Sequence, residues 1–239
     1  MKIVFQLDYY MSGQFAGLAM AKERGLFAQR GIDCVLHPPC EPGEEASMVL
    51  LGQEQDPSSL WLGSMEQNNL IDASISSPSK LTAIGAMFKR SPLALAVLPT
   101  KKGMGSSLND MQNCTIGVHC DTIEILRALM PTSARLVEVD RKSCLGHSGV
   151  NRLITGELDA VQLYDTTEVA AIHKAIGAEP IIIPLCLSAG AGSKIDLGYA
   201  QTMFGCSDKV AQYNNLVELF LEALFEGWRM AIHDPIEAG

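Results

Sequence analysis

The chain of 239 residues carries 27 Asp and Glu against 18 Lys and Arg, a formal charge of −9 at neutral pH. This acidic balance argues against nucleic acid or an anionic membrane as a standing partner, because both bind a basic surface. With 47% hydrophobic residues, the composition is that of a globular protein long enough for one large domain or two smaller lobes.

Sorting signals are missing from the sequence. No apolar run reaches the ~18–20 residues that a membrane-spanning helix needs, and the most hydrophobic stretch, residues 216–232, is interrupted by charged residues. The N-terminus passes from Met1 and Lys2 directly into a strand pattern, so the sequence indicates no signal peptide. We therefore expect a cytoplasmic location, or a periplasmic or extracytoplasmic one if a signal has been removed.

The cysteine pattern gives no sign of a metal site. Seven cysteines are present, an odd number, and none forms a C-x-x-C pair. Cys34 and Cys40 are six residues apart, as are Cys114 and Cys120, and this spacing matches no common zinc motif. We expect free thiols in a reducing compartment, with no bound metal and no cofactor.

The chain opens with a strand that passes directly into a helix. Residues 3–7 alternate as a strand, and a helical spacing begins at Phe15. In open α/β sheets, ligands bind outside the carboxyl ends of the strands. Asp8, Tyr9 and Tyr10 are therefore expected at the mouth of a ligand cleft.

The same alternation of strands and helices continues along the chain. Further strands are predicted at residues 32–36, 60–62, 81–88, 93–98, 114–118, 136–139, 160–164, 180–187 and 199–204. Helices are predicted at residues 44–51, 122–130, 150–154 and 214–232, with two more after residues 64 and 165. This order predicts an α/β protein.

Three strand-to-helix junctions have a capping-box spacing, in which a short polar residue is followed three positions later by Gln or Glu. The pairs are Ser64 with Gln67, Asp121 with Glu124, and Asp165 with Glu168. Each pair predicts a helix start at the carboxyl end of a strand, where free backbone N–H groups favour a small anion or polar ligand. If the sheets face each other, the three helix starts would line one cleft.

Nine short strings occur in one order along the chain. They are LDYY at 7–10, AG at 16–17, AKERGLF at 21–27, GS at 63–64, RSPLAL at 90–95, CTIGV at 114–118, GELDA at 156–160, LEAL at 221–224 and DPIEA at 234–238. Together they resemble the substrate-binding proteins of ABC transporters for thiamine-pyrimidine precursors, taurine, alkylsulfonates and nitrate.

This resemblance implies the fold of a type II periplasmic binding protein, in which two α/β lobes close on a ligand between them by hinge motion. It implies a first lobe built from residues 1–97 and 199–239 and a second lobe from residues 98–198. The hinge strands would lie near residues 95–99 and 198–203.

The resemblance also suggests ligand-binding residues. The pyrimidine-binding branch has an aromatic residue at the position of Tyr9, where a rigid ring stacks on a flat ligand. Glu66 and Asp165 could accept hydrogen bonds from an aminopyrimidine, or be solvated or capping acids. Lys89 and Arg90 could instead favour a phosphate or sulfonate, or be ordinary surface charges. The candidate residues are Asp8, Tyr9, Tyr10, Gln14, Phe15, Ser64, Met65, Glu66, Lys89, His119, Cys120, Asp121, Thr122, Tyr164 and Asp165.

One member of the family is an enzyme, the fungal synthase that makes the thiamine pyrimidine from pyridoxal phosphate and its own histidine. Its cofactor-binding Lys and its consumed His correspond here to Met65 and Asn69, and its run of consecutive cysteines is absent. A Schiff base needs the lysine amine. We therefore expect that this chain is not an enzyme.

The sequence thus predicts a small-molecule-binding domain for a thiamine-precursor pyrimidine or a related small polar ligand. The alternatives are an enzyme of thiamine-pyrimidine biosynthesis and a binder of a sulfonate or nitrate-type anion. The expected macromolecular partner is an ABC permease or a fused signalling domain, which would make the chain part of a sensor.

Overall fold

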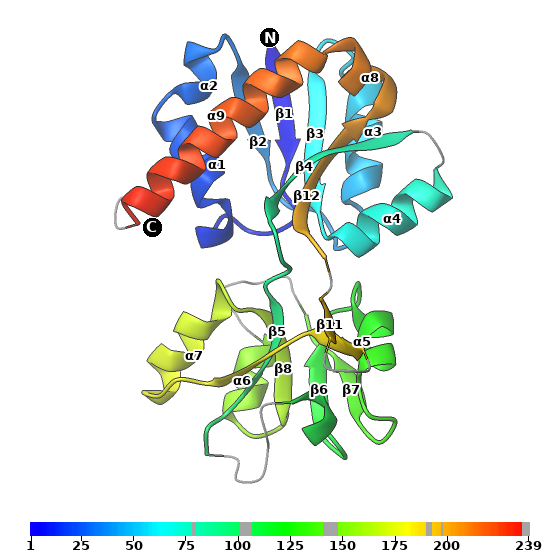
Figure 1. Ribbon diagram of the computed structural model, residues 1–239, viewed down its shortest axis with the longest axis vertical. Helices are drawn as coiled ribbons and strands as arrows, with labels where there is room; N and C mark the ends of the chain where they lie inside the picture. Colours follow the sequence, from blue (N-terminus) through cyan, green and yellow to red (C-terminus); the bar gives the residue numbers. More distant parts are fainter. Residues whose placement is uncertain (78–79, 101–106, 141–147, 190–192, 197, 236–239) are drawn as a thin grey trace. The chain divides into compact units, whose positions relative to one another are not determined.

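In the computed structural model, the chain is described except for residues 78–79, 101–106, 141–147, 190–192, 197 and 236–239 (Figure 1). It divides into two compact units. The first unit contains Met1–Lys89 and Gly198–Gly239, and the second contains Arg90–Leu197. Each unit has its own five-stranded sheet.

The first unit begins and ends the chain. Its elements are β1 (Lys2–Gln6), η1 (Gly13–Phe15), α1 (Ala16–Glu23), α2 (Leu26–Gln29), β2 (Asp33–His37), α3 (Glu45–Gln55), β3 (Leu60–Met65), α4 (Gln67–Ser76), β4 (Leu81–Phe88), β12 (Ala200–Cys206), α8 (Ser207–Gln212) and α9 (Asn214–His233). The strand order is β2-β1-β3-β12-β4. Among the described helices of both units, none is long and apolar enough to cross a bilayer.

Strand direction decides which ends meet in this sheet. β1 is parallel to β2 and β3, whereas β12 is antiparallel to both β3 and β4. Thr202, near the start of β12, is paired with Met65 on one side and Ala86 on the other. The carboxyl ends of β1, β3 and β4 therefore meet the amino end of β12 at one edge, which we call the first carboxyl edge.

Helices cover both faces of the first sheet. On one face, the ring of Phe220 in α9 stacks on Phe5 and Phe27, with centroids 5.6 and 5.2 Å apart. On the other face, Val49 of α3 packs in a buried cluster with Phe204. Alternation along the strands explains this arrangement, because neighbouring residues point to opposite faces.

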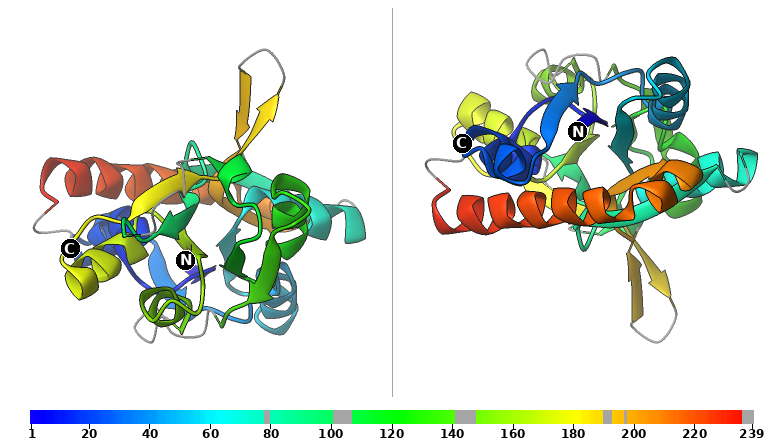
Figure 2. Two further views of the ribbon diagram at one scale, coloured as in Figure 1. Left: turned by 90° about the horizontal axis from the view of Figure 1, so that it is seen from below. Right: turned by 90° about the horizontal axis from the view of Figure 1, so that it is seen from above.

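The helix α9 lies against α1 and α2, so the last helix of the chain packs on the first two (Figure 1). Figure 2 shows α9, in orange and red, alongside the blue helix α1. Glycines allow this close approach: a Cβ at Gly227 would lie 2.1 Å from the carbonyl oxygen of Gly17, and one at Gly17 would lie 2.2 Å from the ring of Trp228.

We expect Gly227→Ala to lower the free energy of unfolding by at least about 2 kcal/mol, because the new methyl group meets backbone that cannot rotate away. Denaturant unfolding monitored by circular dichroism measures the change. Ile232→Ala, at a 75% exposed position of the same helix, is the control and should stay within about 0.5 kcal/mol of the parent. Equal stability of the two variants would contradict the close-packing interpretation.

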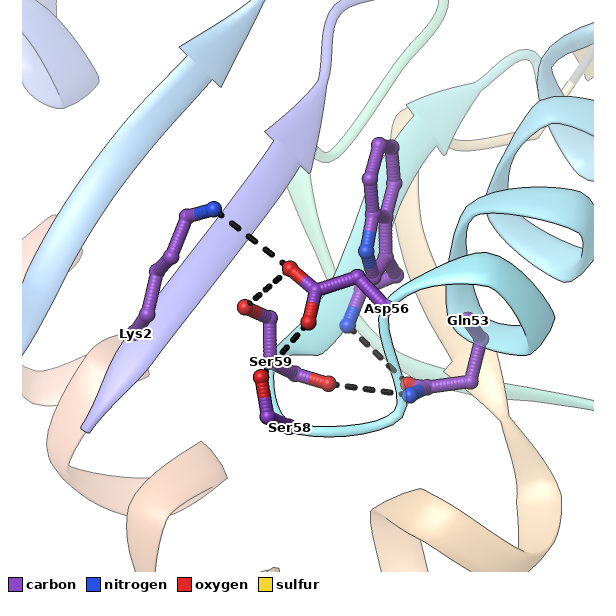
Figure 3. A network of polar contacts seen from close by, with 6 residues as sticks. Lys2, Gln53, Asp56, Ser58 and Ser59 are labelled. Atoms are coloured by element: carbon purple, nitrogen blue, oxygen red, sulfur yellow. Dashed lines mark hydrogen bonds and ion pairs between the residues drawn. The ribbon is translucent and has the colours of Figure 1, made fainter.

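A polar turn precedes β3 (Figure 3). The Asp56 carboxylate accepts hydrogen bonds from the hydroxyls of Ser58 and Ser59, both at 2.6 Å, and from Lys2 Nζ at 3.4 Å. These donors, the two hydroxyls first, lower the pKa of Asp56 from 3.8 to about 2. The charged form of Asp56 is therefore favoured by folding.

This lowered pKa predicts part of the acid sensitivity of the first unit. Stability from Asp56 is complete above its ordinary pKa of 3.8 and is lost as the pH falls through about 2. In Asp56→Asn, unfolding free energy should fall less steeply over this acidic range. Ser58→Ala, which removes one donor, should have an intermediate slope, and an unchanged slope in Asp56→Asn would exclude this contribution.

The second unit has a mixed sheet. Its elements are β5 (Leu93–Val97), η2 (Leu108–Asp110), β6 (Thr115–Val118), α5 (Ile123–Leu129), β7 (Arg135–Glu138), α6 (Ser148–Ile154), β8 (Ala160–Tyr164), α7 (Glu168–Ile176), β9 (Ile181–Pro184), β10 (Cys186–Ala189) and β11 (Ser193–Asp196). The strand order is β7-β6-β8-β5-β9. β10 and β11 form a separate antiparallel pair, which extends away from this sheet in Figure 2.

The carboxyl ends of β6 and β8 meet at one edge of this sheet, because the two strands are parallel. β5 runs in the opposite direction, so Leu93 at its start is paired with Tyr164 at the end of β8. We call this the second carboxyl edge. Leu153 of α6, Leu163 of β8 and Ile172 of α7 belong to the buried apolar cluster of this unit.

The division of the chain differs from the expected one at its first boundary. We expected residues 1–97 in the first lobe, but β5 pairs with β8 and β9 of the second sheet. The contacts therefore separate the units between Lys89 and Arg90. Hydrophobic alternation predicts that residues 93–98 form a strand but does not specify which sheet the strand joins.

The three predicted capping boxes are absent, although a helix follows each junction. Ser64 lies within β3, and the N-cap position of α4 is Glu66. The N-cap positions of α5 and α7 are Thr122 and Thr167, and none of these three residues makes a side-chain cap. The helix α4 begins later than predicted because pairing with β12 extends β3 as far as Met65.

Candidate functional site

A buried carboxyl group lies at the centre of the first carboxyl edge. Asp8 follows β1 and is 5% exposed, and the Ser64 hydroxyl donates to its Oδ1 at 2.7 Å. Ser64 lies in β3, the strand beside β1. The residue predicted as a helix cap thus connects two neighbouring strands and holds the carboxyl group of Asp8 in place.

Aromatic side chains lie beside this carboxyl group. Tyr9 is buried, and Tyr10 is partly buried, with the two rings edge to face and their centroids 5.6 Å apart. Phe15 is fully buried at the end of η1. The predicted aromatic wall therefore consists of one packed pair of rings and one ring that belongs to the core.

The remaining candidates in the first unit differ in exposure. Met65 packs in the apolar cluster that contains Val49, which favours a structural role. Glu66 is 3% exposed at the N-cap position of α4. Lys89 is exposed at the boundary of the unit. Of these three side chains, Glu66 has the buried polar character expected of a ligand-binding group.

Buried amides near the same edge have no protein partner. Gln14 and Gln201 are 0% exposed, and neither the Nε2 nor the Oε1 atom of either residue has a hydrogen-bond partner in the described structure. The buried hydroxyl oxygen of Thr202 also has no hydrogen-bond partner in the described structure. A buried polar group without a partner costs roughly 1–3 kcal/mol, so such groups call for an explanation.

Gln201 and Thr202 were missed by the sequence analysis. They precede a run of apolar residues and carry no motif, so the pattern predicts only a strand at this position. Their place at the first carboxyl edge follows from the pairing of β12 with β3 and β4. Only the sheet order reveals that they lie at the same edge as Asp8.

At the second carboxyl edge, Gln162 connects β8 with the loop that follows β6. Its Oε1 accepts hydrogen bonds from the His119 backbone N–H at 3.0 Å and from the Thr122 hydroxyl at 2.7 Å. Its Nε2 has no partner in the described structure. The sequence analysis identified His119 and Thr122 but missed Gln162, which holds them together.

The other candidates of the second unit lie around the end of β8. Tyr164 is 1% exposed, and its backbone N–H donates to Oε2 of Glu168 at 3.0 Å. Asp165 is exposed, but partial loss of hydration raises its pKa above the ordinary value. Cys120 is exposed, and Asp121 is partly buried.

Five cysteines form no disulfide in the described part of the chain: Cys34, Cys40, Cys114, Cys120 and Cys206. Burial raises the pKa of Cys34 and Cys40 to about 12 and that of Cys206 to about 11. These three remain protonated at neutral pH and are poor nucleophiles. No group of three metal-ligating side chains occurs among the described residues.

Residues 12–238 match the family described as NMT1/THI5 like. The chain belongs to the NMT1/THI5-like family. This match covers both units, and it agrees with the family resemblance of the sequence strings. A comparison with curated proteins finds no significant match.

Solved structures similar to this NMT1/THI5-like protein include several substrate-binding proteins. They include the periplasmic aliphatic sulphonate binding protein SsuA from Escherichia coli, with a TM-score of 0.65, 13% identity, and coverage of 100% of this chain and 71% of that one. The alkanesulfonate-binding protein SsuA from Xanthomonas axonopodis pv. citri, bound to MOPS, has a TM-score of 0.63, 13% identity, and coverage of 100% and 76%. An amino acid ABC transporter substrate-binding protein from Streptococcus pneumoniae, bound to L-arginine, has a TM-score of 0.59 and 14% identity. The match covers 94% of this chain and 87% of that one.

The predicted fold class is confirmed. Two α/β units with five-stranded sheets, together with these similar structures, identify a fold like that of type II periplasmic binding proteins. At 13–14% identity, the likeness concerns the fold alone. Hinge closure and the ligand-binding residues stay predictions.

We expect Ser64→Ala to lower the free energy of unfolding by about 1–3 kcal/mol, because it removes a hydrogen bond from a buried carboxyl group. Thermal or denaturant unfolding of the ligand-free protein measures the change. Ser74→Ala is the control, since that hydroxyl donates only to the Leu70 carbonyl within α4 and its loss should be nearly neutral. Similar losses in the two variants would exclude a special role for the Asp8 contact.

Proposed function

We propose that this protein binds a small polar molecule of the aminopyrimidine class, such as a thiamine precursor, and acts as a solute-binding or sensory component. The observation that carries this proposal is the set of buried polar side chains at the first carboxyl edge. Asp8, Ser64, Gln14 and Gln201 are all at least 95% buried. In α/β sheets this edge is where ligands bind.

An uncharged ligand fits these residues better than an anion. The buried polar and charged residues of the described structure include Asp, Glu, His, Gln, Ser and Thr, but no Lys or Arg. Sulfonate and phosphate sites commonly use cationic or other N–H donors. Carboxylate and amide oxygens are instead suited to accept hydrogen bonds from amino groups, which favours an aminopyrimidine over the sulfonates named for the similar structures.

Binding is favoured over catalysis. The position that corresponds to the cofactor-binding Lys of the fungal synthase is Met65, which is 1% exposed within an apolar cluster. A thioether cannot form a Schiff base. The described thiols with raised pKa values are also poorly suited to nucleophilic chemistry.

The proposed partner follows from the named function of the similar structures. The similar structure from Streptococcus pneumoniae is named as the substrate-binding protein of an amino acid ABC transporter. An ABC permease is therefore a natural partner for this protein, and a signalling domain would take its place if the binding unit serves as a sensor.

The test is thermal unfolding of the purified protein with hydroxymethylpyrimidine, formylaminopyrimidine, thiamine, taurine and nitrate. A ligand present at ~100 times its Kd adds about 2.7 kcal/mol of stability, which for a chain of this size raises Tm by about 5–10 °C. We expect this rise with a pyrimidine and not with taurine or nitrate. Tyr9→Ala should abolish the rise, whereas Tyr9→Phe should retain it because the ring is preserved.

Tyr213→Ala is the matched control. Tyr213 precedes α9, after the carboxyl end of β12, and so lies away from the first carboxyl edge. Its variant should show the full ligand-induced rise above its own ligand-free Tm. A Tm that rises with taurine or nitrate alone would identify an anion as the ligand in place of the pyrimidine. A Tm that rises with none of the compounds would contradict the proposed ligand class.

A further inference from the structure

The first unit contains four buried glutamines that fall into two classes. Gln53 is fully paired: its Nε2 donates to the Ser59 carbonyl at 2.9 Å, and its Oε1 accepts from the Trp61 backbone N–H at 3.1 Å (Figure 3). Gln6 is paired as well, with its Nε2 2.7 Å from the Pro38 carbonyl oxygen. The other two, Gln14 and Gln201, have no partner for either amide atom in the described structure.

The paired glutamines have an evident structural role. Gln53 holds the turn before β3, and Gln6 connects β1 with the loop after β2 through Pro38 and through the ring of His37, 2.8 Å from its Oε1. Gln14 and Gln201 make no such connection. Because a buried amide without a partner destabilises the folded state, the fully buried position of both side chains points to a role in binding.

The two unpartnered glutamines come from opposite ends of the chain: Gln14 lies in η1, between β1 and α1, and Gln201 lies at the start of β12. Gln201 adjoins Ala200, which is paired with Phe88 at the end of β4. The Phe88 ring meets the ring of Trp228 edge to face, with centroids 5.7 Å apart. That same indole ring lies against Gly17, in the first turn of the helix that follows η1 and Gln14. These contacts link the segment that carries Gln14 with the segment that carries Gln201.

The backbone of Gln201 gives a second, independent sign. Its φ is +45°, in the left-handed region that side chains other than glycine rarely adopt. The strand is held there from both sides: the Tyr199 backbone N–H donates to Gln67 Oε1 at 3.0 Å, and Thr202 is paired with Met65. Strained backbone of this kind concentrates at ligand-binding sites.

We propose that Gln14 and Gln201 bind the ligand directly and that they select an uncharged heterocycle in which an amino group adjoins a ring nitrogen. This inference rests on the proposed function and adds the residues that determine specificity. An amide presents an acceptor and a donor side by side, and a ring nitrogen next to an amino group presents the complementary pair. Glutamine recognises the corresponding edge of adenine in DNA by the same two hydrogen bonds.

The amide pair also disfavours an anion. A sulfonate offers only acceptor oxygens, so it can pair with the N–H groups of Gln14 and Gln201 but leaves both carbonyl oxygens buried without a donor. An aminopyrimidine can engage both atoms of one amide. A second amide then remains to bind other polar atoms of the ligand.

The test uses Gln14→Met and Gln201→Met, which preserve side-chain length and remove the amide, with Gln53→Met as the matched control. Each variant is measured without ligand by thermal unfolding and with hydroxymethylpyrimidine by isothermal titration calorimetry. We expect Gln14→Met and Gln201→Met to keep or raise the ligand-free Tm, because a buried amide without a partner has been removed. Their Kd should rise about tenfold or more.

The control should show the reverse pattern. Gln53→Met should lower the ligand-free Tm, since the Ser59 carbonyl and Trp61 N–H lose their partner, and should leave the Kd unchanged. A hydroxymethylpyrimidine analogue that lacks the amino group should bind the parent protein with a higher Kd. Gln201→Met should raise the Kd of this analogue little further. This second measurement separates amide recognition from a general disturbance of the site.

Two results would overturn the inference, and they differ in what else they affect. If the parent protein binds hydroxymethylpyrimidine and both Gln variants retain its Kd, the amides do not bind ligand, while the proposed function stands. If the parent protein binds none of the pyrimidines, the proposed ligand class and this inference fail together.

Discussion

The pairing of β12 with β3 and β4 is the constraint on which the first unit depends. β12 carries the chain back from the second unit and enters the first sheet antiparallel to its two neighbours. This pairing completes the sheet, and it positions α9 against α1, where Gly17 and Gly227 allow the helices to approach closely. It also places the start of β12 at the edge where β1 and β3 end, so residues from both ends of the chain contribute to one candidate site.

The buried polar groups of the first unit fall into two kinds. Around Gln53 and Ser59, donors and acceptors are matched within the turn, and the network serves the fold. At the first carboxyl edge, the amides of Gln14 and Gln201 are buried without that matching. Proteins commonly tolerate such local cost where binding requires it. The same side chain, glutamine, is thus fully paired at position 53 and unpaired at positions 14 and 201 of the described structure.

Local patterns predicted most of the elements and the fold class. The alternating strand at residues 81–88 corresponds to β4, and the amphipathic stretch at residues 214–232 corresponds to α9. These patterns succeed because the period of apolar residues reflects which face of an element is buried. The capping-box spacing failed at all three junctions. After β8, Glu168 accepts a hydrogen bond from the Tyr164 backbone N–H. After β3, pairing with β12 extends the strand past Ser64. A short spacing motif cannot register such long-range pairing.

The sequence by itself determined the α/β class, the order of strands and helices, and the polar or aromatic residues that follow β1, β3, β6 and β8. These properties depend on near neighbours in the chain, which periodicity and short strings record. The tertiary structure alone decided that β5 belongs to the second sheet, that Ser64 binds Asp8, and that Gln201 lies at the first carboxyl edge. Each of these depends on which distant strands pair, and strand pairing is selected by the packing of the whole sheet.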